Sequence, residues 1–403
     1  MVALAVFAVI ITLGGMRVIG FTDVIQVVVL IIGGIATTYV ALTLVSEHFG
    51  LGKDVLAGFN KLMEDSPKHF EMIVDKPGVG ATQEEINKYL MLPGIGMYLA
   101  GIWIVNLNYW GCNQYITQRA LGADLKTARM GILFAGLLKL LMPLIVMLPG
   151  IAAYVLYKNG ALQEEMAPGG VFHADNAYSA ILGHLPNGMK GLALAALTAA
   201  IVAGLAGKAN SIATIYTLDI YKKYINTAAS EAKMVWIGKI TIVVSIVVAV
   251  LFTWNDTLGI GGAGGFTFIQ KYTGFISPGV FAMFLLGMFW KRTTGPAAIT
   301  GLISGFTLSI FFNEFATKVF GPETWLYTAY INKSGQYEIP FQICMGLAFA
   351  FTLALMIGVS LFGPKENPKA FVLDKKMFKV EPSILVLIVV TLLLVTAIYV
   401  RFW

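Results

Sequence analysis

The sequence predicts an all-α integral membrane protein, and its composition and long apolar runs both support this. Of its 403 residues, 57% are hydrophobic and 12% are charged, against roughly 25% charged in soluble proteins. Several apolar windows exceed the roughly 20 residues that cross a hydrocarbon core about 30 Å thick. Because no water inside a bilayer satisfies backbone polar groups, these windows must be helical.

Ten apolar segments are predicted to be transmembrane helices. The first, 2–13, directly follows Met1 without the charged start or cleavage pattern of a signal peptide, so it is interpreted as the end of a helix whose upstream part is absent. In the second, 21–44, Thr22 can cap the helix, with Asp23 in the favourable first turn. The other eight predicted spans are 91–110, 129–157, 190–218, 235–254, 266–290, 295–315, 340–362 and 383–402.

A polar segment at 45–89 is predicted to be an extracellular or periplasmic loop. Within it, 55–63 is amphipathic, and ATQEEI from Ala81 has the Thr and Glu of a capping sequence. Short surface helices are expected at both places.

Loop charges set the predicted topology, because Lys and Arg concentrate in short cytoplasmic loops. One set of alternate loops has more Lys and Arg than Asp and Glu: 111–129 (three against one), 219–233 (three against two), 290–295 (two against none) and 363–381 (five against three). The other set has the opposite balance: 45–89 (five against eight), 158–190 (two against three) and 255–265 (none against one). Span 91–110 should therefore run from outside to inside, and Trp403 should lie outside.

Several function classes are excluded by the same sequence. The net charge of +6 is explained by loop topology, so no nucleic-acid partner is predicted. Cys112 and Cys344 lack metal-ligand spacing, and no hydrolase motif or Walker sequence is present, so the chain is not predicted to be an enzyme and no cofactor is expected. The run GIGGAG at 259–264 follows a transmembrane helix instead of a strand, so it does not indicate dinucleotide binding.

Polar residues crowd near the inner end of span 91–110, at Asn106, Asn108, Tyr109 and Trp110. Amides in a membrane helix can simply bond neighbouring helices, and the aromatic pair can belong to an interfacial belt. In the next span Lys139 lies about ten residues inside, where an ammonium usually faces a cavity or partner, although its long side chain can reach the interface.

In span 266–290, Gln270 lies near the outer end of a helix that Pro278 interrupts. Buried amides, a buried lysine and interrupted helices are typical of transporters. Together they indicate a binding site for an uncharged, hydroxyl-rich or zwitterionic solute.

At these residues the sequence resembles the sodium/solute symporter family, and within it the bacterial sodium/galactose cotransporters and their animal sodium/glucose relatives. The resemblance covers almost the whole chain in the family order. The segments that carry it are TDVIQ at 22–26, YWGCNQYITQRALGA at 109–123, NSIATIYTLDIYKKY at 210–224, FIQKYTGFISPG at 268–279 and FWKRTTGPAAITG at 289–301.

The resemblance implies a core of two inverted repeats of five helices with sugar bound at the midplane. It implies that Asn106, Lys139 and Gln270 bind sugar hydroxyls. Tyr109 would be a substrate-contacting inner gate, with Trp110 beside it.

The resemblance also implies sodium as the coupling ion. Asp23 matches a family aspartate near the sodium pathway, and the sodium site would use Ala200, Ala203 and Gly204. Many members have hydroxyl residues in place of Ala203 and Gly204, so here this helix would offer sodium only backbone carbonyls. Ser211 and Thr214 lie a turn or more away.

Compared with the family, the first three core helices and most of the fourth are expected to be missing. Residues 1–44 would then end the first repeat, 45–89 would be the loop, 90–290 the second repeat, and 291–403 peripheral helices. The expected function is sodium-coupled sugar symport in a multi-pass cell membrane protein, in the inner membrane if bacterial. The alternatives are a symporter for an amino acid or vitamin, or a non-transporting membrane fragment or sensor.

Overall fold

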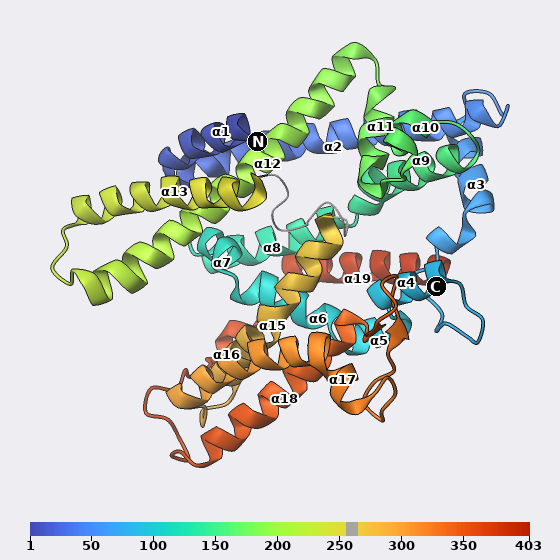
Figure 1. The fold of residues 1–403 in the computed structure, drawn as a ribbon. Coiled ribbons are helices and arrows are strands. Elements are labelled where there is room, and N and C mark those ends of the chain that lie inside the picture. The colour runs from blue at the N-terminus through green and yellow to red at the C-terminus, as the bar shows by residue number, and fades with distance from the viewer. Residues whose placement is uncertain (255–264) are drawn as a thin grey trace. The chain divides into compact units, whose positions relative to one another are not determined.

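The computed structural model describes residues 1–254 and 265–403 (Figure 1). Helices make up nearly all of the regular structure, which confirms the all-α prediction. The GIGGAG run at 259–264 and most of the predicted loop at 255–265 lie outside the described residues.

The chain forms two compact units, each described by itself. Unit 1 consists of Met1–Phe70 and Gln118–Gly264, and unit 2 of Glu71–Thr117 and Gly265–Trp403. The units are defined by the contacts within each of them and not by a repeat of the fold. They therefore do not test the predicted boundaries of the two inverted repeats, which stay predictions.

Unit 1 is built from long helices that are joined by short helical segments and turns. They are α1 (Val2–Leu13), α2 (Gly15–His48), α3 (Val55–Asp65), η1 (Pro67–His69), α8 (Leu125–Lys139), the π-helical η3 (Pro143–Met147), α9 (Leu148–Lys158), α10 (Gln163–Met166), η4 (Pro168–Gly170), η5 (Ala174–Asn176), α11 (Ala177–Gly183), α12 (Asn187–Ile215), the π-helical η6 (Tyr216–Ile225) and α13 (Glu231–Thr253).

Unit 2 combines helices with one small antiparallel hairpin. Its elements are α4 (Gln83–Met91), α5 (Gly94–Leu99), α6 (Ile102–Leu107), the π-helical η2 (Asn108–Cys112), α15 (Gly265–Phe289), α16 (Gly295–Ile310), the π-helical η8 (Phe311–Phe315), α17 (Ala316–Phe320), β1 (Tyr330–Ile331), β2 (Tyr337–Glu338), α18 (Phe341–Leu361), η9 (Lys375–Phe378) and α19 (Pro382–Phe402). Helix α7 (Gln114–Ala120) spans the boundary between the units.

The predicted membrane spans all correspond to helices. Within the described part of the chain, eight helices are long and apolar enough to cross a membrane, and α1 is a shorter apolar helix. The ninth candidate is a pair, Gln83–Leu99 and Ile102–Cys112, bent by 77°. The predicted span 91–110 therefore contains a sharp bend between Leu99 and Ile102.

The bend lies where unit 2 leaves no room for a side chain. A Cβ at Gly101 would lie 2.5 Å from the backbone and side-chain oxygens of Gln342 on α18. A Cβ at Gly346 would lie 2.7 Å from the Ala100 side chain. The chain changes direction where small residues allow α18 to approach its backbone.

The predicted start of the second span is wrong. Helix α2 begins at Gly15, whose φ of +79° suits glycine, and not at Phe21. The Thr22 hydroxyl donates to the Ile19 carbonyl at 3.0 Å from inside the helix, so it is no cap, and Asp23 lies beyond the first turn. Ile19 is fully buried, so tertiary packing extends the helix past the expected cap.

The two surface helices expected in the polar segment are confirmed. The Asp54 carboxylate caps α3 by accepting from the amides of Leu56 and Ala57. Thr82 and Glu85 form the predicted capping box of α4.

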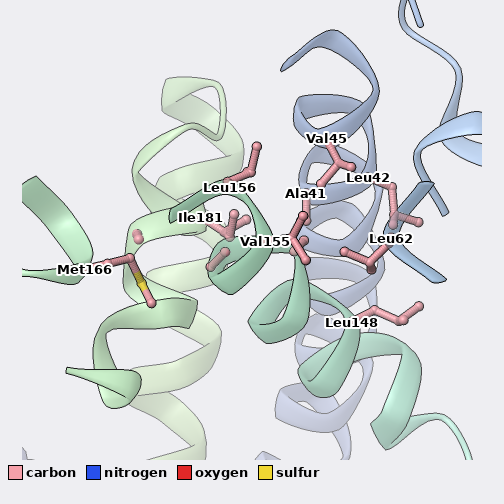
Figure 2. Close-up of a cluster of buried hydrophobic side chains, with 12 residues drawn as sticks. Ala41, Leu42, Val45, Leu62, Leu148, Val155, Leu156, Met166 and Ile181 are labelled. Carbon is pink, nitrogen blue, oxygen red and sulfur yellow. The ribbon is translucent and has the colours of Figure 1, made fainter. Parts of the chain in front are cut away.

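A hydrophobic cluster fixes α3 to the membrane helices of unit 1 (Figure 2). Residues from α2, α3, α9, α10 and α11 meet there, among them Val45, Leu62, Val155 and Ile181, all almost fully buried. Gly58 of α3 faces the Leu42 carbonyl without room for a Cβ. A surface helix is thus packed tightly against a transmembrane one.

Candidate solute and sodium sites

Four of the predicted solute-site residues belong to unit 2. Asn106 lies on α6, Tyr109 and Trp110 on η2, and Gln270 on α15, which packs against α6 and η2. Gln270 is half-buried and Asn106 is exposed. The Asn106 amide nitrogen donates to the Ile102 carbonyl at 2.8 Å, within its own helix.

Asn108 bonds a neighbouring helix. Its Nδ2 donates to Ser277 Oγ at 3.2 Å, and the fully buried Ser277 donates to the Thr273 carbonyl at 2.9 Å. The buried Asn108 Oδ1 has no hydrogen-bond partner among the residues that the structure describes. The sequence analysis missed Ser277, whose position directly before the helix-interior Pro278 was the available signal.

The aromatic pair lies in a π-helical turn. Tyr109 and Trp110 are half-buried, with ring centroids 5.9 Å apart and planes at 87°. Single π-helical turns interrupt the regular bonding of a helix and are frequent at functional sites. A break in the regular helical bonding therefore begins at Asn108, two residues after Asn106.

Lys139 belongs to unit 1. It is the last residue of α8 and lies near the middle of the apolar segment Leu125–Lys158, with an exposed side chain. Because this lysine and the other solute residues lie in different units, a single site that combines them stays a prediction.

The predicted sodium residues are all in unit 1. On α12, Ala200 is exposed, while Ala203 and Gly204 are half-buried. Asp23 Oδ2 accepts from Arg119 Nη2 at 2.9 Å, with both side chains less than one-third exposed. The buried Asp23 Oδ1 meets no hydrogen-bond partner within 1–254 and 265–403.

A polar cluster beside Arg119 was missed from the sequence. Gln118 Nε2 donates to Thr214 Oγ1 at 3.1 Å, and Ser211 Oγ donates to Gln118 Oε1 at 3.4 Å. These bonds connect α7 to α12, about two to three turns beyond Gly204 along the helix. The adjacent Gln and Arg in YITQRALGA were the available signal.

An ion pair next to Gln270 was also missed. Lys271 Nζ lies 3.0 Å from Glu338 Oε1, and Asn332 Nδ2 donates to Glu338 Oε2 at 3.0 Å. The hairpin of β1 and β2 is thereby attached to α15, one residue from the predicted sugar ligand.

Clustered metal-binding side chains do not occur in the described part of the chain. No group of three or more His, Cys, Asp or Glu residues there could hold a metal ion. Sodium does not require such a cluster, since hydroxyl, carbonyl and carboxylate oxygens can bind it, as in broken-helix transporters.

Comparison with known proteins identifies the family. The sequence model of the sodium:solute symporter family matches residues 1–305. A sodium/glucose cotransporter of Vibrio parahaemolyticus is 36% identical over 411 residues, which cover 99% of this chain and 69% of that protein. The chain belongs to the sodium:solute symporter family. This membership confirms the predicted all-α transporter fold. It also confirms the prediction that the protein is a transporter and not an enzyme.

Other symporters show the same relationship over a shorter part of their length. Human sodium/myo-inositol cotransporter 2 is 30% identical over 76% of this chain and 46% of its own length. The sodium/mannose cotransporter of Bos taurus is 30% identical over 75% and 51%. The chain thus spans about half the length of these mammalian relatives.

A solved structure supports the fold. The substrate-bound structure of a Na+-coupled sialic acid symporter matches with a TM-score of 0.63 at 17% identity, covering 89% of this chain and 66% of that one. At this identity the likeness shows the shared fold alone. The expected absence of core helices before residue 1 stays a prediction.

Proposed function

We propose that the protein carries out sodium-coupled symport of a sugar, galactose or glucose, by alternating access. The observation that carries the proposal is the 36% identity to a sodium/glucose cotransporter along 99% of the chain. The polar residues in its membrane helices supply a chemically suitable site.

Sugar recognition would use neutral and cationic donors. The amides of Asn106 and Gln270 and the Lys139 ammonium can all donate to sugar hydroxyl oxygens. Aromatic rings such as that of Tyr109 can pack against the apolar face of a pyranose. Asn108, held by Ser277, would keep the π-helical turn against α15.

Coupling would follow from differential binding to two conformations. Sodium would bind the outward-open state more tightly and shift the population toward it. Sugar would then close the outer side, and Tyr109 would move aside to release sugar inward.

The sodium site would be weaker than one with side-chain hydroxyls. Ala203 and Gly204 offer sodium only backbone carbonyls. A carboxylate near the ion would therefore be more important as a sodium ligand. The Oδ1 atom of Asp23, which has no partner among the described residues, is suited to that role.

Uptake measurements test the proposal. Radiolabelled galactose uptake would be measured in proteoliposomes with and without an inward sodium gradient. Uptake should depend on the gradient, and uptake indifferent to sodium would exclude coupling.

A second candidate is symport of another solute. The relatives include cotransporters named for myo-inositol and mannose, and the structural neighbour is named for sialic acid. Amino acids and vitamins belong to the same alternative. Competition of labelled galactose uptake by each unlabelled solute separates these candidates.

A third candidate is a non-transporting membrane protein or sensor. The alanine and glycine at 203 and 204, together with the Asp23–Arg119 ion pair, favour it because they remove sodium ligands. This candidate predicts no sodium- or sugar-dependent thermal shift of the protein.

The protein would lie in the cell membrane, in the inner membrane if bacterial. The eight candidate spans and the family membership support a multi-pass protein with the lipid bilayer as its surroundings.

A further inference from the structure

The carboxylate of Glu338, in the β1–β2 hairpin of unit 2, has a fixed orientation. Its Oε2 accepts from Asn332 Nδ2 at 3.0 Å, and Asn332 Oδ1 accepts from two backbone amides of the hairpin turn, each at 3.0 Å. The next residue along the chain, Ile339, is 1% exposed within a hydrophobic cluster. One carboxylate oxygen is therefore held inside the hairpin, and the other, Oε1, lies 3.0 Å from Lys271 Nζ on α15.

Two further hydrogen bonds attach the hairpin to other elements of unit 2. Gln83 Nε2 on α4 donates to the Ile331 carbonyl at 2.9 Å. The Thr317 hydroxyl on α17 donates to the Tyr337 carbonyl at 3.3 Å. The carboxylate that pairs with α15 therefore belongs to an anchored hairpin.

One face of α15 lies toward this hairpin and α18. Gly274 and Pro278 follow Lys271 by three and seven residues, a spacing that places all three on one side of a helix. A Cβ at Gly274 would lie 2.6 Å from Met345 Cε on α18, the helix that follows the hairpin. Pro278 has no amide hydrogen, so α15 lacks the regular bond to the Gly274 carbonyl. The position of the segment before Pro278 therefore depends more on contacts of this face.

A neighbouring face of the same segment carries a predicted solute residue. Gln270 and Ser277 are seven residues apart, about two turns, and share a side of α15. Ser277 Oγ accepts from Asn108 Nδ2 of η2 at 3.2 Å. Because Gln270 directly precedes Lys271, its direction about the helix axis is set once Lys271 is held by the hairpin.

The ion pair is shielded enough to hold the helix. The Lys271 and Glu338 side chains are 29% and 28% exposed. Fully exposed ion pairs contribute little to stability, whereas removal of one partner from a shielded pair leaves an uncompensated charge. The loss of either charge should therefore loosen α15 around Gln270.

We infer that Lys271 and Glu338 are positioning residues of the solute site. Their ion pair fixes the predicted outer half of α15, residues 268–277, to the hairpin and thereby sets the affinity for the solute. Neither side chain contacts the solute in this role. The effect on affinity rests on the proposed symport, whereas the fixing of α15 does not.

The kinetics of sodium-driven galactose uptake test the effect on affinity. Glu338→Gln and Lys271→Met should each raise KM about tenfold with little change in the maximal rate, because each loosens Gln270 without removing it. The double variant should raise KM no further than either single one, because both remove the same interaction. Lys271→Arg, which keeps the ion pair, should retain the original KM. A raised KM in Lys271→Met alone would mean that this lysine binds the solute itself, and would overturn the inference.

Hydrogen–deuterium exchange of the protein in detergent tests the fixing of α15 without transport. The amides of 268–277 should exchange about tenfold faster in Glu338→Gln and in Lys271→Met, while those of 280–289 keep their rate. Unchanged exchange of 268–277 in both variants would overturn the inference. Faster exchange with an unchanged KM would overturn the effect on affinity.

An ion pair of unit 1 supplies the matched control. Lys61 Nζ lies 2.8 Å from Asp65 Oδ1, and the two side chains are 24% and 23% exposed. Asp65→Asn should therefore leave both the KM and the exchange of 268–277 unchanged. A complete lack of sodium-driven uptake in the unsubstituted protein would contradict the proposed symport instead, and the exchange rates would still decide whether the ion pair fixes α15.

Discussion

Two charged residues inside predicted membrane spans behave differently. Asp23 is held by Arg119 at 2.9 Å with both side chains largely buried, while Lys139 is exposed near the middle of its long segment. The sequence indicated that Lys139 was unusual at its depth, whereas Asp23 was predicted to lie in the first turn of its helix. It could not identify Arg119 as a partner, because that contact joins residues 96 positions apart.

Lys139→Ala should abolish sodium-driven sugar uptake, because it removes a strong donor to sugar hydroxyls. Uptake in proteoliposomes measures the loss. Lys158→Ala, at the C-terminal end of the same apolar segment, is the matched control and should retain uptake. Normal uptake by the Lys139 variant would rule out its role in binding.

Asp23→Asn and Arg119→Gln should each destabilise the protein. Each substitution leaves the remaining charged side chain, which is less than one-third exposed, without an oppositely charged partner. Their combination should be less destabilising than the sum of the two, with a coupling energy of about 1–2 kcal/mol. Denaturant unfolding of the four proteins gives this energy. Additive effects would show that the ion pair contributes no stability.

At the scale of elements, helix identity was predictable and helix geometry was not. Hydrophobic runs located every span, and the Thr82 capping box and the α3 amphipathic pattern were confirmed. The start of α2 was predicted incorrectly, and the 77° bend after α5 was not predicted. Both depend on distant packing, of Ile19 in the interior and of Gly101 against Gln342.

Gly58→Ala should destabilise unit 1 by about 1–3 kcal/mol, because the added methyl group would collide with the Leu42 carbonyl. Helix propensity alone predicts the opposite sign, a gain of about 1 kcal/mol. Thermal unfolding checks the sign. Gly131→Ala, with open space around its position on α8, should be neutral or stabilising.

At the scale of the whole molecule, composition and motif order were sufficient for the class. They predicted a membrane transporter of the sodium:solute symporter family, and the family match over residues 1–305 confirms it. The residues predicted to bind solute belong to both compact units, and that they form one site stays a prediction. Its substrate and sodium ligands stay proposals.

The loop charges predict a topology that labelling can check. In a background without Cys112 and Cys344, Ser334→Cys in the hairpin turn should react with an impermeant maleimide on intact cells. Asn226→Cys, in the loop between η6 and α13, should react only after permeabilisation. The reverse pattern would invert every assignment of inside and outside.

The sequence by itself determined the membrane class, the order of the apolar helices, and the family, since these depend on hydrophobicity and local motifs. Tertiary structure decided where α2 begins and where the broken span bends. It also decided that Asn108 bonds Ser277 and that Asp23 pairs with Arg119. These outcomes depend on contacts between segments distant in sequence, which no local pattern encodes.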